Sequence, residues 1–162
     1  MLADAYLGKR LQDLLTLAHS QMKTVYEKNG LKIPVEGSST LHILAPGKRM
    51  ALTEIARALG QSHQLIAQRL GKLRSLDLIE QLAHPDDKRC TLYTLTPAGE
   101  EEWRRLDQLM ATTAEVNRGL YEQIGCNLVE ALDAATKALE RDTYPARFEA
   151  VAAGSTLERA AT

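Results

Sequence analysis

The 162-residue sequence is poor in the residues on which several protein classes depend. Its two cysteines, Cys90 and Cys126, are too few for a disulfide scaffold, so a reducing cytoplasm is the expected location. No apolar run approaches the ~18–20 residues that a membrane-spanning helix needs, and no signal-peptide pattern is expected at the N-terminus. One Trp, one Phe and five Tyr are too few for a stacking platform for single-stranded nucleic acid.

The sequence also lacks a marked excess of positive or negative charge, because its net charge at pH 7 is only −1. The molecule as a whole does not attract nucleic acid, so any such binding must come from the local placement of Lys and Arg. What the sequence has in abundance is Leu (26) and Ala (22), against 5 Val and 6 Ile. Leu and Ala favour helix and β-branched residues favour strand, so we expect a mostly α fold with little sheet.

Apolar residues three and four apart predict long helices near both ends of the chain. Their apolar stripes cover Leu7–Val25, Leu106–Leu120 and Leu128–Leu139. A single protomer would expose these stripes to water, which predicts a dimer. The segment from residue 142 onwards is rich in Ala, Gly and Ser and is expected to be a flexible tail.

The densest local signals lie between residues 50 and 96. One helix is predicted to end at Gly60, and Ser62, only two residues later, is the predicted N-cap of the next helix. In the following helix Ile66, Leu70 and Leu73 share one face. Two strand-like runs, 78–82 and 90–95, flank a charged turn at 84–89. This order predicts a helix-turn-helix followed by a β-hairpin wing.

The segment from Leu52 to Glu101 resembles the winged helix-turn-helix of MarR-type transcriptional regulators. Its most specific part is Asp87-Lys88-Arg89 followed by Leu92, Leu95, Thr96 and Gly99. The resemblance implies a mostly α winged helix-turn-helix fold with a small β-hairpin wing and N- and C-terminal dimerisation helices. It implies a homodimer that binds a palindromic double-stranded operator, usually as a repressor, often released by a small-molecule effector. The expected parts are a dimerisation helix (1–30), the DNA-binding domain (38–96), C-terminal dimerisation helices (97–141) and the tail (142–162).

The predicted recognition helix offers polar and basic side chains to the major groove of DNA. The candidate contacts there are Ser62, His63, Gln64, Gln68, Arg69 and Lys72. A Gln amide can pair bidentately with adenine N6 and N7, although most exposed Gln residues merely form a solvated polar face. The family often has small hydroxyl residues at the positions of Gln64 and Leu65, so Leu65 either contacts a thymine methyl or is partly core.

The wing carries the remaining candidates. The resemblance implies that Arg89 enters the minor groove, that Lys88 meets a phosphate and that Asp87 orients the guanidinium. The alternative for Asp87 and Arg89 is a surface ion pair worth ~0–1 kcal/mol. One of Lys72 and Arg74 is expected to contact phosphate, or both are surface cations. Residues 44–95 hold eight basic and five acidic side chains, a net charge of +3 against −4 elsewhere.

By analogy with the family, an effector pocket lies between the first helix and the winged domain. His19, Met22, Tyr26 and His42 are its candidate lining, with ordinary core or dimer packing as the alternative for each. A rival function from another class is a winged-helix protein-interaction module without DNA binding, which the near-neutral net charge favours.

Nothing in the sequence indicates an enzyme, a cofactor or a metal site. Neither a nucleophile motif nor a phosphate-binding glycine loop is present, and the four histidines are scattered. Cys90 follows the cation Arg89, which leaves a redox-sensing role open, but a lone Cys at a strand start is usually a small packing residue.

Overall fold

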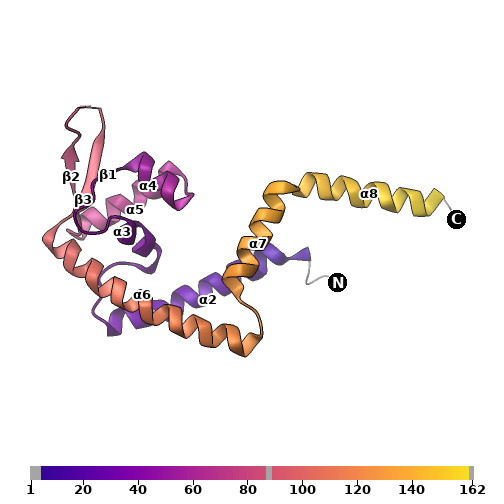
Figure 1. Cartoon of the computed structure of the whole chain (residues 1–162), viewed down its shortest axis with the longest axis horizontal. Coiled ribbons are helices and arrows are strands. Elements are labelled where there is room, and N and C mark those ends of the chain that lie inside the picture. Colours follow the sequence, from indigo (N-terminus) through magenta and orange to yellow (C-terminus); the bar gives the residue numbers. More distant parts are fainter. Residues whose placement is uncertain (1–4, 87–88, 161–162) are drawn as a thin grey trace. The chain divides into compact units, whose positions relative to one another are not determined.

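The chain folds into helices and one small sheet, which confirms the expected fold class (Figure 1). The computed structural model describes residues 5–86 and 89–160. Its elements in chain order are α2 (Leu7–Lys28), η1 (Val35–Gly37), α3 (Ser38–Ile43), β1 (Met50–Ala51), α4 (Leu52–Leu59), α5 (His63–Ser75), β2 (Ile79–Ala83), β3 (Thr91–Leu95), α6 (Pro97–Ile124), α7 (Leu128–Arg141) and α8 (Tyr144–Ala160).

The chain divides into two compact units, residues 1–111 and 112–162. The division falls inside α6. The predicted N-terminal helix and the first half of α6 therefore belong to the same compact unit as the winged elements.

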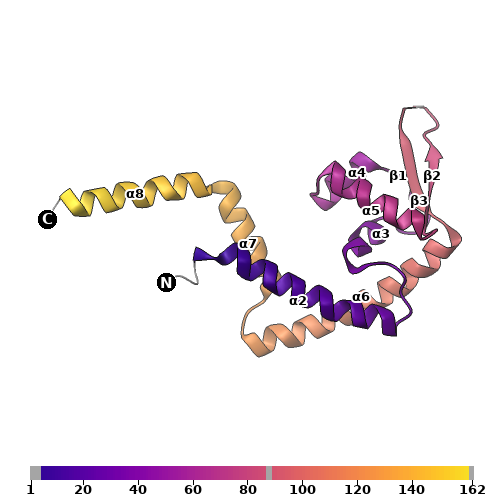
Figure 2. The same cartoon turned by 180° about the vertical axis from the view of Figure 1, so that it is seen from behind.

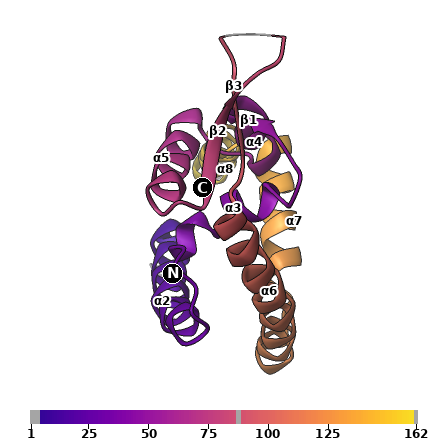
Figure 3. The same ribbon diagram turned by 90° about the vertical axis from the view of Figure 1, so that its left-hand side faces the viewer.

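The sheet contains three antiparallel strands in the order β1-β3-β2. β2 and β3 form the predicted hairpin, with Ile79 opposite Leu95 and Gln81 opposite Tyr93. The hairpin projects beyond α4 and α5 (Figure 3). β1 was not predicted, because two residues are too few to show an alternating pattern; it is a strand because Met50 pairs with Tyr93 across the sheet.

The core of the first unit lies between α3, α4, α5 and the base of the sheet. The three α5 residues expected to face inwards, Ile66, Leu70 and Leu73, are all buried. Leu41 and Ile55 contribute from α3 and α4. This burial fixes α5 by its inner face and turns its other face outwards.

The start of α6 is attached closely to the hairpin. Thr96 caps the helix: its Oγ1 accepts a hydrogen bond from the Gly99 backbone N–H (3.0 Å) and donates one to the Asp77 carbonyl (2.6 Å). A Cβ atom at position 99 would lie 1.8 Å from the carbonyl oxygen of Leu78. The glycine of the wing motif is therefore needed for this close approach of two backbones.

The chain leaves α2 through residues 29–34, which lead into η1 and α3 (Figure 2). This connection is held by Glu102 of α6, whose carboxylate accepts hydrogen bonds from the backbone N–H groups of Lys32 (2.5 Å) and Ile33 (2.8 Å). Glu102 is only 3% exposed. A buried carboxylate is tolerable here because two backbone donors satisfy it.

The second unit contains the end of α6 together with α7 and α8. Asn127 caps α7, because its Oδ1 accepts hydrogen bonds from the backbone N–H groups of Val129 (3.1 Å) and Glu130 (3.4 Å). In the segment expected to be a flexible tail, residues Tyr144–Ala160 form the helix α8. The Arg147 guanidinium fixes the α7–α8 junction by donating to the carbonyls of Asp142 (2.8 Å) and Ala138 (3.1 Å).

Candidate nucleic-acid interface and effector pocket

The outer face of α5 presents most of the predicted DNA contacts to solvent. Ser62 caps the helix, with its Oγ accepting a hydrogen bond from the Leu65 backbone N–H (3.3 Å). Because the opposite face is buried, the side chains that remain exposed include polar and basic ones: His63, Gln64, Gln68 and Lys72.

Arg69 differs from its neighbours, because it is half-buried. Its Nη1 donates to Gln61 Oε1 (2.5 Å) in the turn that follows Gly60, which has a left-handed φ of 61°. The structure therefore places Arg69 as a link between α5 and the turn before it. Sequence reasoning counted Arg69 among the DNA contacts and did not identify Gln61, because a pair of this kind leaves no periodic signal in the sequence.

Leu65 is half-buried and lines a cavity of about 300 Å³ together with Pro34 and Gly37. Part of its side chain therefore faces the η1 segment, which agrees with the partly-core alternative.

The wing places Arg89 just before β3. The backbone N–H of His84 donates to the carbonyl of Cys90 (3.2 Å), which extends the hairpin by one bond beyond the ladder. The Arg89 side chain is exposed. Asp87 and Lys88 lie outside the described residues, so their expected roles stay predictions.

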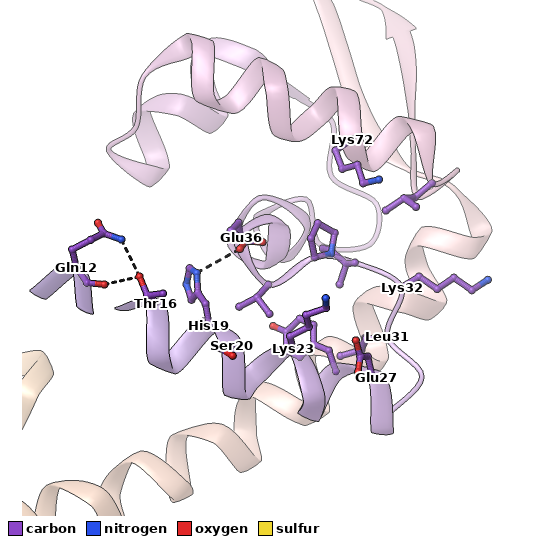
Figure 4. Close-up of a pocket in the computed structure, with 15 residues that line it drawn as sticks. Gln12, Thr16, His19, Ser20, Lys23, Glu27, Leu31, Lys32, Glu36 and Lys72 are labelled. Carbon is purple, nitrogen blue, oxygen red and sulfur yellow. Dashed lines mark hydrogen bonds and ion pairs between the residues drawn. The ribbon is translucent and has the colours of Figure 1, made fainter. Parts of the chain in front are cut away.

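A cavity of about 740 Å³ lies between α2, residues 31–36 and the end of α5 (Figure 4). Its charged lining consists of Lys23, Lys32 and Lys72 with Glu27 and Glu36, and His19 joins it from α2. His19 Nδ1 lies 3.6 Å from Glu36 Oε1. Side chains from α2 and from α5 thus line one space.

Tyr26 lies at the inner wall of this cavity and is buried. Its hydroxyl forms a hydrogen bond of 2.7 Å with Ser38 Oγ. Burial raises the pKa of the Tyr26 phenol, and the hydrogen bond to Ser38 opposes that shift. The side chain is therefore a neutral hydroxyl at physiological pH.

The other two candidate effector residues lie elsewhere. Met22 packs against the hydrophobic core. The His42 ring stacks on Trp103 of α6 with centroids 5.4 Å apart, and its Nε2 lies 3.0 Å from Asp107 Oδ1. Trp103 Nε1 also donates to the His42 carbonyl (2.9 Å). His42 thus belongs to the joint between α3 and α6, while His19 and Tyr26 line the cavity.

Within residues 5–86 and 89–160, no group of three His, Cys, Asp or Glu side chains is arranged to hold a metal ion. None of the helices in this described part is long and apolar enough to cross a membrane. Cys90 is half-buried and Cys126 is exposed.

The paired helices α4 and α5 with the adjoining hairpin define a winged helix-turn-helix protein. Similar solved structures include a probable transcriptional regulator from Pseudomonas aeruginosa (21% identity, TM-score 0.63, 85% of this chain and 98% of that chain covered). Wild-type MarR from E. coli is 19% identical with a TM-score of 0.56, covering 82% of this chain and 96% of that one. A MepR–DNA complex from S. aureus is 21% identical with a TM-score of 0.50, covering 75% and 98%.

Residues 34–89 match the MarR family, and no curated protein matches the chain. Over these residues the chain is similar to the MarR family, which confirms the resemblance found in the sequence.

Proposed function

We propose that this chain is a homodimeric transcriptional regulator that binds double-stranded DNA with α5 in the major groove and Arg89 of the wing in the minor groove. The observation that carries this proposal is the exposed α5 face, where amides at Gln64 and Gln68 lie beside Lys72. Amides can read adenine edges, and a lysine can meet the adjacent phosphate. The MepR–DNA complex, whose fold is similar, supports DNA as the ligand.

The homodimer is supported by apolar side chains that a single chain leaves in water. On α2 they are Leu7, Leu11, Leu14, Leu15 and Leu17, and on α6 they are Val116, Leu120 and Ile124. Exposed apolar surface of this extent marks an interaction site. A two-fold dimer places its recognition helices in successive major grooves about 34 Å apart, so the operator is palindromic. A dimer bound to an operator blocks transcription from it, so we propose that the protein acts as a repressor.

A small-molecule effector that releases DNA fits the cavity between α2 and α5. Three lysines against two glutamates favour an anionic effector there. Since Lys72 belongs to both this lining and the outer face of α5, a bound anion competes for a side chain proposed to contact DNA. If the effector binds the DNA-free dimer more tightly than the DNA-bound dimer, it lowers the affinity for the operator. The factor equals the ratio of the effector's two affinities.

The test is to select bound sequences from random duplexes and to measure affinity for the selected duplex at two salt concentrations. We expect affinity to fall steeply as salt rises, because phosphate contacts release counterions. Arg89→Ala is expected to weaken binding by about tenfold or more, the scale of one groove contact. Lys137→Ala, which removes a cation from α7, is the matched control and should change little.

Gln68→Ala is expected to relax sequence preference more than it weakens non-specific binding, because an amide–base pair gives ~1–3 kcal/mol of discrimination. Equal losses on every sequence would contradict base reading. A wild-type protein that enriches no duplex, or binds without salt dependence, would instead favour the protein-interaction module.

A further inference from the structure

A chain of side-chain hydrogen bonds connects the last turn of α5 with the hairpin. Arg74 Nη1 donates to Gln81 Oε1 on β2 (2.6 Å). Gln81 Nε2 in turn donates to the Tyr93 hydroxyl on β3 (3.2 Å). Three elements of the winged domain, α5, β2 and β3, are thus joined by three side chains.

The position of this chain follows from the strand register. Ile79 pairs with Leu95 at the buried base of the hairpin, and the pair two residues further along, on the same face, is Gln81 with Tyr93. The polar chain therefore begins where the apolar core under the hairpin ends.

The Gln81 amide is used in the only orientation that suits both neighbours. Its carbonyl oxygen accepts from a guanidinium that is always protonated, and its NH2 group donates to a hydroxyl. The flipped amide would set two donors against each other. The charge-assisted bond to Arg74 is the stronger of the two.

The two strands of the hairpin are held differently. β3 lies in the middle of the sheet and pairs with β1 through Met50 and Ala51. β2 is an edge strand, and Arg74 provides its side-chain hydrogen bond from α5. Beyond Gln81 the ladder continues only to Ala83 opposite Thr91, and Arg89 lies two residues further on.

We infer that Arg74 is a positioning residue for the wing, acting through Gln81 to hold the hairpin at the angle to α5 that lets Arg89 reach the minor groove while α5 occupies the major groove. This inference rests on the proposed DNA-binding function. It differs from the simpler expectation that a basic residue at this end of the helix contacts a phosphate.

A double-mutant cycle separates the two roles, using the selected duplex and the full-length chain. If Arg74 acts through the wing, Arg74→Ala weakens binding by roughly fivefold in the wild-type background and by less than about twofold in the Arg89→Ala background, because the effects of coupled residues do not add. Gln81→Leu should give the same pattern without changing the charge. Lys72→Ala is the control, a proposed direct contact whose loss should be the same in both backgrounds.

The opposite outcome is equally distinct. If Arg74 contacts a phosphate itself, Arg74→Ala weakens binding equally in both backgrounds and lowers the salt slope by about 0.9 even without Arg89. Gln81→Leu would then have no effect. This result would overturn the inference while leaving the proposed function intact.

A measurement without DNA distinguishes failure of the inference from failure of the proposed function. Hydrogen exchange should quicken at the backbone amides of β2 and β3 in Arg74→Ala and Gln81→Leu, with an unchanged melting temperature showing that both variants fold. Exposed Glu80→Gln on the other face of β2 is the control. Unchanged exchange in both variants overturns the inference whatever the DNA result. A wild-type protein that binds no duplex, with faster exchange in both variants, overturns the proposed function and leaves only the support of the hairpin by Arg74 and Gln81.

Discussion

Leucines with the same helical spacing have opposite environments in two regions of this molecule. On α5, Leu70 and Leu73 are at most 2% exposed, whereas on α2, Leu14 and Leu17 are 48% and 56% exposed. Periodicity thus predicts a helix and its apolar face in both regions. It does not say whether the same chain covers that face. The high exposure of the α2 leucines identifies the surface that a second copy of the chain is proposed to cover.

The largest effect expected within the winged region comes from Gly99→Ala. Its Cβ would overlap the Leu78 carbonyl oxygen, and backbone cannot move aside as a side chain can. We expect a loss of about 4 kcal/mol or more in the free energy of unfolding, measured by chemical denaturation at fixed protein concentration. Gly119→Ala in α6 is the control, where a Cβ meets open space and the helix should gain ~1 kcal/mol. Similar effects at the two glycines would contradict the close approach at Leu78.

The comparison between covered and uncovered leucines is sharpened by Leu73→Ala and Leu120→Ala. The first leaves a cavity in the core and should lower the free energy of unfolding by about 3 kcal/mol. The second, 41% exposed, should change the stability of one protomer little and raise the dissociation constant of the dimer. Light scattering over a dilution series measures that constant; a monomeric wild-type protein at all concentrations would refute the dimer.

A smaller effect is expected from Glu102→Leu, which removes the acceptor for the part-buried backbone N–H of Lys32 and the buried backbone N–H of Ile33. Leaving such donors without partners costs roughly 1–3 kcal/mol. Exposed Glu101→Leu, which breaks ion pairs with Arg104 and Arg105, is the control and should cost ~1 kcal/mol or less. Equal losses in the free energy of unfolding for the two variants, measured in urea, would show that burial does not make the Glu102 hydrogen bonds more important for stability.

The smallest effect concerns Tyr26. Because its pKa is raised on folding, the unfolded chain ionises first as pH rises above 10, and this group's contribution to stability, present below that pH, is lost as pH rises through the folded pKa. Tyr26→Phe should remove this part of the alkaline loss while costing ~1 kcal/mol at pH 7 for the hydrogen bond to Ser38. Melting temperatures from pH 8 to 11 measure both; parallel curves for the two proteins would exclude the linkage.

Predictions based on neighbouring residues agreed best with the structure. The inner face of α5 and the hairpin depend on spacing within a few turns, and the cap at Ser62 depends on one side chain beside its own backbone. The segment after residue 142 contains Gly and Ser but also several alanines, and Ala, with the highest helix propensity, favours the helix α8 there.

For the site residues, the periodicity of the sequence predicted which side chains of α5 are exposed. It did not predict which side chains form hydrogen bonds or stack with each other. Arg69 bonds Gln61, and His42 stacks on Trp103 sixty-one positions away. Neither pairing produces a repeat or a local motif, so a sequence places these side chains on an element without showing what they touch.

The order of leucines, caps and turns in the sequence determined the helices, the hairpin and the outward face of α5, because helix and strand periodicities are properties of nearby residues. Only the tertiary structure decided that two residues at Met50–Ala51 form a strand, that Glu102 holds a loop some seventy positions earlier, and that Gly99 admits the Leu78 carbonyl. Those features depend on which distant segments come together, and that is settled by packing the whole core at once.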